Sequence, residues 1–186
     1  MCNSDEIEIV VASAEHKKYV DEILDTITAA AKVRGTGIAK RSPEYVIQKM
    51  CEHKAVLALC HGEFAGFSYI ESWSNKKFVA NSGLIVAPKF RGIGLAKRIK
   101  RRIFDLSREM FPEAKIFSLT TGEAVMKMNS ELGYRPVTFP SLTDDEAFWR
   151  GCENCVNYDI LQRYGGTKCL CTGMLYDPAE HVDDGK

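Results

Sequence analysis

The most informative stretch of the sequence is Gly83-Leu-Ile-Val-Ala-Pro-Lys-Phe-Arg-Gly-Ile-Gly-Leu-Ala96. A β-branched strand is expected to end at Val86, and after a proline turn the loop at 91–94 leads directly into a helix. Two glycines let the backbone approach a ligand closely, and the first N–H groups of a helix have no partner within it. Together with the positive end of the helix dipole, these groups predict an anion-binding site. The loop lacks the GK[ST] ending of a P-loop and the GxGxxG pattern of dinucleotide sites, so it indicates neither nucleotide hydrolysis nor dinucleotide binding.

Hydrophobic periodicity on both sides of this stretch predicts an α/β protein. Alternating or β-rich runs predict strands, and apolar residues at helical spacing predict helices. The strands are expected at 7–12, 55–59, 64–73, 78–86, 115–121, 135–138 and 168–176, and the helices at 15–31, 43–50, 95–110 and 123–132. This order predicts a mixed sheet with helices on both faces, in a single domain over residues 1–176. Residues 141–168 are interpreted as a cysteine-containing insert before the last strand, and residues 177–186 as an acidic, flexible tail.

The charge composition argues against a general nucleic-acid or membrane-surface binder. The 186 residues include 25 Lys and Arg and 25 Asp and Glu, which gives a formal net charge of zero. We therefore expect neither nucleic acid nor membrane as a partner. No apolar run approaches the ~18 residues of a membrane helix, and the N-terminus is acidic where a signal peptide would be basic. The sequence thus predicts a cytoplasmic protein.

The pattern V-x-P-x-[FY]-R-G-x-G-[LI]-[AG] resembles the acyl-CoA pyrophosphate loop of the GCN5-related N-acetyltransferases (GNAT family). The resemblance covers nearly the whole chain through Thr138, and it implies a mostly antiparallel central sheet flanked by helices on both faces. It also implies acetyl-CoA or another acyl-CoA as co-substrate, a small-molecule amine as acceptor, and a homodimer as one arrangement common among members. In this family the loop amides hold the pyrophosphate, and the preceding strand pairs with the pantetheine arm. The residues implied for CoA are Leu84, Ile85, Val86, Arg91, Gly92, Ile93, Gly94, Leu95 and Ala96.

The residues that would move protons are less clearly marked. Many family members place a tyrosine in the helix after the fifth strand, to protonate the departing thiolate. Alignment on Leu132-Gly133-Tyr134 puts Asn129 at that position, and Tyr134 falls where the family has a packing aromatic. Glu71 is the only acid in a central strand, so it is either a general base or a charge at the sheet edge facing solvent. The catalytic candidates are therefore Glu71, Asn129 and Tyr134.

Two further segments are similar to the acetyltransferase domain of N-acetylglutamate synthases. They are Gly37-Ile-Ala-Lys-Arg-Ser-Pro-Glu-Tyr-Val46 and Phe117-Ser-Leu-Thr-Thr121. In those enzymes the matching segments hold the carboxylates of the substrate, which implies Lys40, Arg41, Thr120 and Thr121 here. The resemblance implies an acidic amino acid as acceptor, most simply L-glutamate, with acetyl-CoA or succinyl-CoA as donor. The reaction would then be the first step of arginine biosynthesis. Gly122 follows the threonine pair where the synthases have arginine.

Two alternatives remain open. One is a family member that acylates another amine, such as a peptide N-terminus or an amino-sugar. The other is a non-catalytic CoA-binding or zinc-dependent interaction module, which the missing tyrosine and the missing acid of the fourth strand would suit. An open acceptor cleft would favour another amine, and a small basic pocket would favour glutamate.

Four cysteines near the C-terminus suggest a structural zinc site. Cys152, Cys155, Cys169 and Cys171 form two close pairs, as in many tetrahedral zinc sites, although the spacing departs from the common CxxC…CxxC. A regular hairpin between the pairs would separate Cys155 from Cys169 by on the order of 20 Å at ~3.3 Å per residue, which excludes a shared ion. An irregular insert would let the four thiols meet. The other reading is four reduced thiols without metal.

Overall fold

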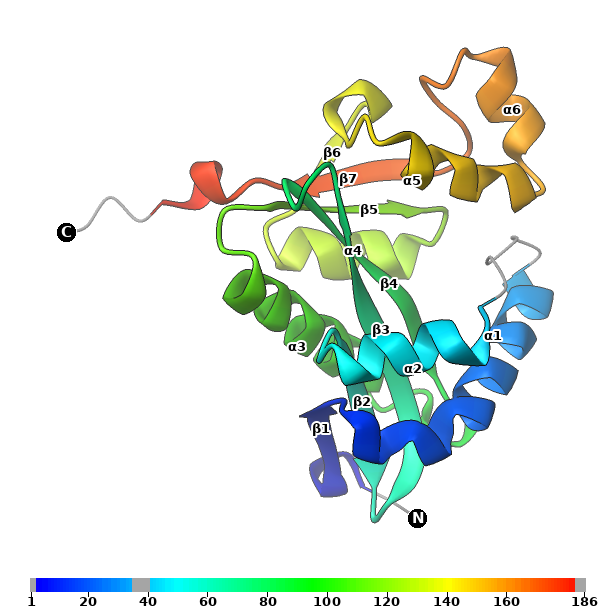
Figure 1. The fold of residues 1–186 in the computed structure, drawn as a ribbon, viewed down its shortest axis with the longest axis vertical. Coiled ribbons are helices and arrows are strands. Elements are labelled where there is room, and N and C mark those ends of the chain that lie inside the picture. Colours follow the sequence, from blue (N-terminus) through cyan, green and yellow to red (C-terminus); the bar gives the residue numbers. More distant parts are fainter. Residues whose placement is uncertain (1–2, 35–40, 183–186) are drawn as a thin grey trace. The chain divides into compact units, whose positions relative to one another are not determined.

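Seven strands follow one another as β1-β2-β3-β4-β5-β7-β6 in the sheet of the computed structural model, which describes residues 3–34 and 41–182 (Figure 1). The strands are β1 (Ile7–Val11), β2 (Ala55–Cys60), β3 (Glu63–Trp73), β4 (Phe78–Val86), β5 (Lys115–Thr120), β6 (Arg135–Val137) and β7 (Thr172–Tyr176). β4 and β5 run parallel, whereas β1–β2, β2–β3, β5–β7 and β6–β7 are antiparallel. The predicted mixed, mostly antiparallel sheet is confirmed.

The helices up to α4 agree with the predicted pattern, and two further helices that were not predicted follow them. The helices are α1 (Val20–Arg34), α2 (Pro43–Cys51), α3 (Leu95–Met110), α4 (Glu123–Glu131), α5 (Glu146–Arg150) and α6 (Tyr158–Arg163). The segment at 141–168, interpreted as a cysteine-containing insert, contains the two short helices α5 and α6. The last strand begins at Thr172 rather than at 168, because the Cys169 thiol accepts the N–H of Cys171 at 3.3 Å and so draws that group away from a strand ladder.

The chain contacts divide into two compact units. The first comprises residues 1–71 and 81–106, and the second comprises 72–80 and 107–186. The boundaries between the units fall within β3, β4 and α3. The single domain predicted for residues 1–176 stays a prediction. Each unit is described separately below.

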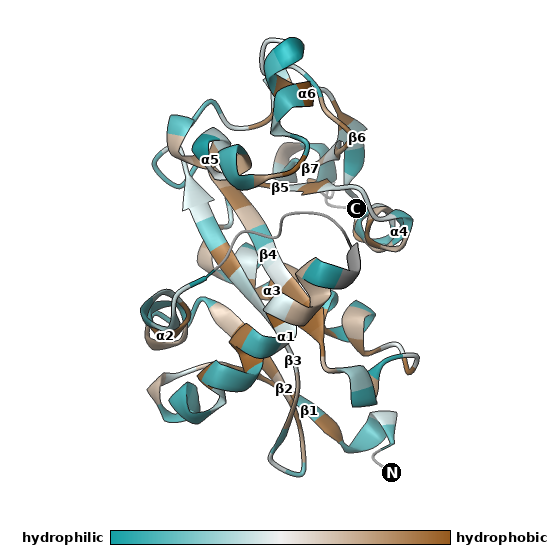
Figure 2. Ribbon diagram, turned by 90° about the vertical axis from the view of Figure 1, so that its right-hand side faces the viewer, coloured by the Kyte–Doolittle hydropathy of each residue, from teal (hydrophilic) through white to brown (hydrophobic). Residues whose placement is uncertain are grey.

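The core of the first unit lies between its strands and the helices α1 and α2. Ile23 of α1, Met50 of α2 and Phe67 of β3 are fully buried in one apolar cluster. The helix α2 begins at Pro43, where the side chain of Ser42 accepts the N–H of Tyr45 at 3.2 Å. Figure 2 shows hydrophobic segments on the strands and mixed polar and apolar residues along these helices.

The helix α3 covers the opposite face of the first unit's strands. A Cβ at Gly66 would lie 2.5 Å from Cδ1 of Ile99, a residue of α3. Phe67, the next residue of β3, points instead into the cluster with α1 and α2. Because successive side chains of a strand point to opposite faces, the two helical layers must lie on opposite faces of β3.

The second unit has its own aromatic core around β5 and β7. Phe117 of β5 is fully buried and meets Phe148 of α5 edge-on, with ring centroids 4.9 Å apart. Trp149 stacks near Phe139 and donates its indole N–H to the carbonyl of Thr143 at 2.8 Å. These contacts attach the segment after β6 to the sheet, which explains why it is ordered rather than a loose insert.

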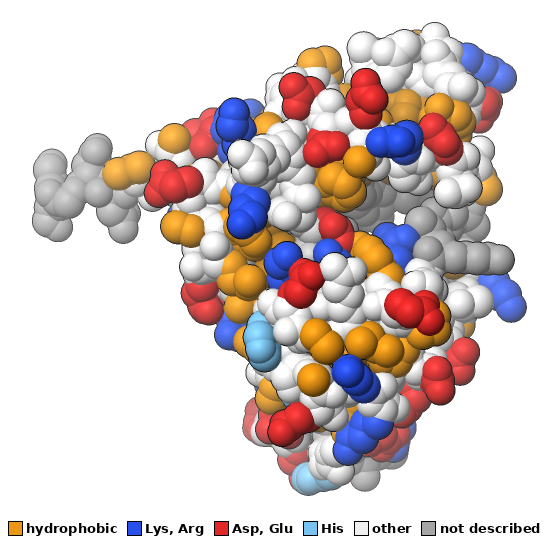
Figure 3. Space-filling model, in the orientation of Figure 1, with side chains coloured by type: hydrophobic (Ala, Val, Ile, Leu, Met, Phe, Trp, Pro, Cys, Tyr) orange, Lys and Arg blue, Asp and Glu red, His pale blue; other side chains and the backbone are white. Residues whose placement is uncertain are grey.

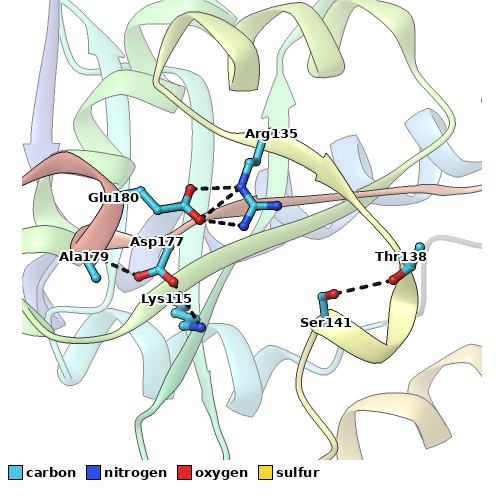
Figure 4. Close-up of polar contacts among 7 residues, drawn as sticks. All are labelled: Lys115, Arg135, Thr138, Ser141, Asp177, Ala179 and Glu180. Carbon is cyan, nitrogen blue, oxygen red and sulfur yellow. Dashed lines mark hydrogen bonds and ion pairs between the residues drawn. The ribbon is translucent and has the colours of Figure 1, made fainter.

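The C-terminal residues after β7 are attached to the second unit by ion pairs (Figure 4). Asp177 lies 3.0 Å from the ammonium of Lys115, and its other oxygen accepts the N–H of Ala179 at 3.0 Å. Glu180 forms a bidentate pair with Arg135. The flexible tail expected from Asp177 therefore begins with an ordered 3-10 helix, Pro178–His181.

Replacing Asp177 with asparagine is expected to destabilise the protein by up to about 1 kcal/mol, because it removes the charge paired with Lys115 while the amide oxygen can still accept the Ala179 N–H. Burial acts to raise the pKa of Asp177, but the hydrogen bonds from Lys115 and the Ala179 N–H lower it by more than burial raises it. The folded-state pKa therefore lies below the ordinary value. The stabilisation is then present above the unfolded pKa of about 4 and is lost as the pH falls through the lower folded value. Thermal unfolding at neutral pH and at about pH 2 should show the difference only at neutral pH.

The matched control is Asp159→Asn. It removes an exposed pair with Arg163, whose atoms lie 3.2 Å apart within α6, and should change stability by only about 0.3–0.5 kcal/mol. Equal effects of the two substitutions would contradict the role given to Asp177.

Among the residues that the structure describes, no helix is both long enough and apolar enough to cross a membrane. The face drawn in Figure 3 carries basic and acidic side chains interspersed, in keeping with equal numbers of the two.

Candidate active site

The glycine-rich loop between β4 and α3 has the geometry of an anion cradle. Gly92 and Gly94 adopt φ angles of 82° and 77°, and a Cβ at either position would meet no atom within 4 Å. The loop is anchored on both sides by Phe90 and Leu95, which are 2% exposed. The backbone between these anchors is exposed, and α3 is long enough to present a full N-terminal turn of amides.

Arg91 belongs to the same loop. Its Nε donates to the carbonyl of Val86 at 3.1 Å, which bends the side chain back toward the end of β4. The guanidinium thus lies beside the last residues of the strand rather than along α3. The two predicted CoA segments are residues 84–86 at the end of β4 and residues 91–96, which lead into α3. The hydrogen bond from Arg91 to Val86 joins them directly.

The side chains of β4 do not alternate regularly between the two faces of the sheet. Asn81 accepts a hydrogen bond from Lys100 of α3 at 3.3 Å, whereas Ile85 packs in the cluster with α1 and α2. Residues four apart in a regular strand face the same way, so the strand must bulge between these two. Gly83 has φ 64°, and a Cβ there would lie 2.4 Å from the ring of Tyr69. Only glycine fits this position.

Arg41 lies against two aromatic rings of the first unit. Its Nε donates to the hydroxyl of Tyr69 at 2.6 Å. Its guanidinium carbon lies 5.6 Å and 5.8 Å from the ring centroids of Tyr45 and Tyr69. The two rings meet edge-on, 5.7 Å apart. A stacked guanidinium is held in one orientation, as carboxylate recognition requires.

Glu71 lies in the same network and faces α2, with its side chain 16% exposed. The ammonium of Lys49 lies 2.5 Å from its Oε1, and the hydroxyl of Tyr45 donates to the same oxygen. Burial raises the pKa of Glu71 to about 7, although Arg41 acts to lower it. Burial lowers the pKa of Lys49 to about 8, helped by the nearby charge of Lys54. The close ion pair acts against both shifts, because each charge stabilises the other.

Sequence reasoning missed three members of this network: Tyr45, Lys49 and Tyr69. A signal for them exists. Lys49 is next to Met50, which is buried, and lies one helical turn after Tyr45, so both belong to one face of α2. Tyr69 precedes Glu71 by two residues in β3, which puts the two on one face of the strand. A lysine at the edge of an apolar helix face could thus have indicated that Lys49 pairs with an acid on the strand beneath.

The remaining predicted residues lie elsewhere in the chain. Lys40 falls outside the described residues. Thr120 ends β5 in the second unit and Thr121 follows it, and the Thr120 hydroxyl accepts the N–H of Gly122 at 3.0 Å. Arg41 and Glu71 are the predicted acceptor and catalytic residues that share one network with each other.

Asn129 and Tyr134, the other two catalytic candidates, are buried in the second unit. Asn129 is 0% exposed and directs its Nδ2 at the sulfur of Met174, 3.7 Å away, while its Oδ1 has no hydrogen-bond partner among the described residues. Tyr134 is 4% exposed, and burial and the neighbouring Tyr176 raise its pKa. Burial of both side chains favours packing over proton transfer to a substrate.

The four C-terminal cysteines do not form a metal site. Across residues 3–34 and 41–182, no group of three or more His, Cys, Asp and Glu is arranged to hold a metal ion, so the zinc expectation is not supported. Cys152 and Cys171 pack against the aromatic core of the second unit. Burial and the neighbouring thiols raise their pKa values to about 11 and about 12. Cys155 and Cys169 accept backbone N–H groups instead.

Comparison with known proteins places the fold. No family model and no curated protein matches the chain. Among solved structures, N-acetylglutamate synthase from Neisseria gonorrhoeae, complexed with coenzyme A and N-acetyl-glutamate, is similar at a TM-score of 0.65 and 17% identity. That match covers 92% of this chain and 35% of the synthase, so the chain spans about a third of that protein's length.

Two similar structures are close to this chain in length. One is yncA, a putative acetyltransferase from Salmonella typhimurium with its cofactor acetyl-CoA (TM-score 0.63, 14% identity, 96% of this chain and 98% of that one). The other is Rv2747 from Mycobacterium tuberculosis in complex with CoA (TM-score 0.62, 14% identity, 91% and 98%). The chain therefore has the fold of the GCN5-related N-acetyltransferases, as its sequence predicts.

Proposed function

We propose that this protein is an acyl-CoA-dependent N-acyltransferase whose acceptor is the amine of a small acidic amino acid, most simply L-glutamate. The observation that carries the proposal is the presence, in one unit, of both an open glycine-rich anion cradle and a half-buried Arg41–Glu71 network. The donor would be acetyl-CoA or succinyl-CoA. With glutamate as acceptor, the product would be the acylglutamate that begins arginine biosynthesis.

The loop residues fit the pyrophosphate of CoA. The open space over Gly92 and Gly94 admits a bulky anion, and the first-turn amides of α3 can donate to it. The backbone of residues 84–86 would pair with the pantetheine arm and so direct the thioester toward the bulge at Gly83. Similar folds bound to CoA and acetyl-CoA support this assignment.

The reaction needs a neutral amine and a route for its proton. In the proposal Glu71 accepts that proton, because burial keeps its pKa near neutrality, where a general base is most effective. The amine then attacks the thioester carbonyl directly. A thiol has an ordinary pKa of about 8.5, so CoA can depart without a strong acid beside it. Tyr134 as proton donor and Asn129 as the residue at the family's tyrosine position remain predictions, and the burial of both argues for packing.

The charges of the network favour an acidic acceptor. Arg41 and Lys49 carry positive charges against the single carboxylate of Glu71, so the site has one cation in excess. Lys49 is paired with Glu71, and in the proposal the stacked guanidinium of Arg41 attracts the carboxylate of the acceptor. Lys40, Thr120 and Thr121 stay predicted members of the acceptor site.

The direct test is CoA-thiol release by the purified protein with acetyl-CoA and succinyl-CoA. The amine panel would be L-glutamate, L-aspartate, L-ornithine, a short peptide and an aminoglycoside. Turnover with glutamate above the others supports the proposal and identifies the donor. Activity confined to a neutral or basic amine would overturn the acceptor assignment and keep the transferase. CoA binding without any turnover would favour a non-catalytic CoA-binding protein.

Gly94→Ala is expected to weaken CoA binding about tenfold or more, equal to at least about 1.4 kcal/mol, because its methyl group would occupy the cradle. The matched control is Gly166→Ala. Gly166 also has φ 77° and open space around its Cβ position, but it lies outside the loop. Both substitutions should cost about 1 kcal/mol of stability from the left-handed backbone. Titration calorimetry with CoA separates them, and equal affinities of the two variants would contradict the cradle.

A further inference from the structure

Two side chains of α2 hold the same oxygen of Glu71. The Lys49 ammonium lies 2.5 Å from Oε1, and the Tyr45 hydroxyl donates to Oε1 as well. Within the described part of the chain, no group is bonded to Oε2. A carboxylate fixed through one oxygen keeps the other at a defined place, still able to accept a proton.

The sequence makes this arrangement rigid. Tyr45 and Lys49 are four residues apart in α2, so they lie one above the other on one helix face. The Lys49 ammonium lies 5.2 Å from the Tyr45 ring centroid, and that ring packs edge-on against Tyr69. Lys49 is 7% exposed, so its long side chain is confined by packing as well as by charge. These contacts thus restrict the two side chains that hold the carboxyl group.

We infer that Lys49 and Tyr45 are positioning residues that fix Glu71 through Oε1 so that Oε2 receives the proton of the acceptor ammonium. This inference rests on the proposed function. In the step, one N–H bond of the ammonium breaks and an Oε2–H bond forms. The freed electron pair of the nitrogen forms the new bond to the thioester carbon, and the C–S bond breaks to release the thiolate of CoA. The second ammonium proton is then transferred to that thiolate, directly or through water.

Lys49 also sets the basicity of Glu71. A cation beside a carboxylate lowers its pKa, so loss of the Lys49 charge should raise the pKa of Glu71 further above neutrality. Among the described residues, the other titratable groups facing this carboxyl are Tyr45 on α2, Arg41 before α2 and Tyr69 on β3. Arg41 acts in the same direction as Lys49 but is bonded to Tyr69.

The test is a carboxyl-carbon NMR titration of Glu71 in the full chain, without substrate, in the wild type and in Lys49→Met and Lys49→Arg. We expect the pKa of Glu71 to rise by about one unit or more in K49M and to stay near the wild-type value in K49R. The acid limb of the kcat/KM profile should move to higher pH by the same amount in K49M. A purely structural lysine would lower activity without moving that limb.

Lys54→Met is the matched control, because it removes the same charge from a residue paired with Glu52 rather than Glu71. It should shift the Glu71 titration much less than K49M does, because Lys54 acts on the network only through Lys49. Tyr45→Phe should lower kcat several-fold with little change in the KM for acyl-CoA, since it removes one of the two contacts to Oε1 without removing a charge. CoA-induced thermal stabilisation would confirm that each variant is folded.

An unchanged Glu71 pKa in folded K49M would overturn the inference. Failure of the proposed function is distinguishable from this, because it would appear as absent turnover in a wild type whose Glu71 titration still responds to Lys49. In that case the proton-acceptor role is overturned together with the proposed function.

Discussion

Glu71→Gln is expected to lower kcat/KM for acyl transfer by about 10²–10⁴-fold, the usual contribution of a positioned general base. The amide has nearly the shape of the carboxylate but cannot accept the proton of the acceptor. Burial raises the pKa of Glu71 to about 7, so wild-type kcat/KM should rise with pH until the carboxyl group ionises near neutrality. E71Q should lack that rise. Initial rates of thiol release from about pH 5.5 to 8.5 measure both effects.

Glu44→Gln is the matched control for this substitution. Glu44 is an exposed residue of the first turn of α2, so the control removes the same charge from the same helix region without touching the network. Its kcat/KM should stay within about twofold, and both variants should bind CoA as the wild type does. An E71Q protein with wild-type kcat/KM would exclude Glu71 as the base and leave positioning alone to supply the rate.

Gly83→Ala is expected to destabilise the protein by about 2–5 kcal/mol. A residue with a side chain pays about 1–2 kcal/mol for the left-handed backbone, and a clash in a packed core adds about 1–3 kcal/mol. The clash here is with Tyr69, whose ring would lie 2.4 Å from the new methyl group and is itself 1% exposed. Because Tyr69 also binds Arg41, affinity for the acceptor should fall in whatever fraction remains folded. Chemical denaturation measures the first effect, and the KM for the amine measures the second.

Gly62→Ala isolates the backbone cost. Gly62 has φ 80°, and a Cβ there would meet no atom within 4 Å. Its substitution should cost only about 1 kcal/mol. If the two alanine variants were equally stable, the bulge of β4 and the contact between Gly83 and Tyr69 would not exist as described.

The fold could be predicted because its signals are local. The loop at 91–94 carries its own glycines, and the strand before it and the helix after it follow from hydrophobic periodicity. Ser42 and Pro43 mark the start of α2 by capping chemistry alone. The bulge at Gly83 could not be predicted, because a glycine in a strand does not reveal its φ angle or the ring of Tyr69 against it.

The site was predictable only in part, for a related reason. Glu71 stood out as the single acid of a central strand, and Arg41 through its segment. Lys49 did not, because a lysine in a helix is usually solvated, and its burial depends on a strand that is distant in sequence. Asn129 was placed correctly in α4, yet its complete burial depends on packing against β7. Spacing within the C-terminal segment likewise could not show that its cysteines pack against aromatic rings rather than around a metal ion.

The most direct measurement is the transfer of label from acetyl-CoA carrying a ¹³C-labelled acetyl group to L-glutamate, followed by mass spectrometry of the products. The account predicts N-acetylglutamate that carries the label, formed in step with free CoA, at a rate that collapses in E71Q and survives in Glu44→Gln. Free CoA with labelled acetate and no labelled amine would contradict it, because the protein would then be a thioesterase rather than an acyltransferase.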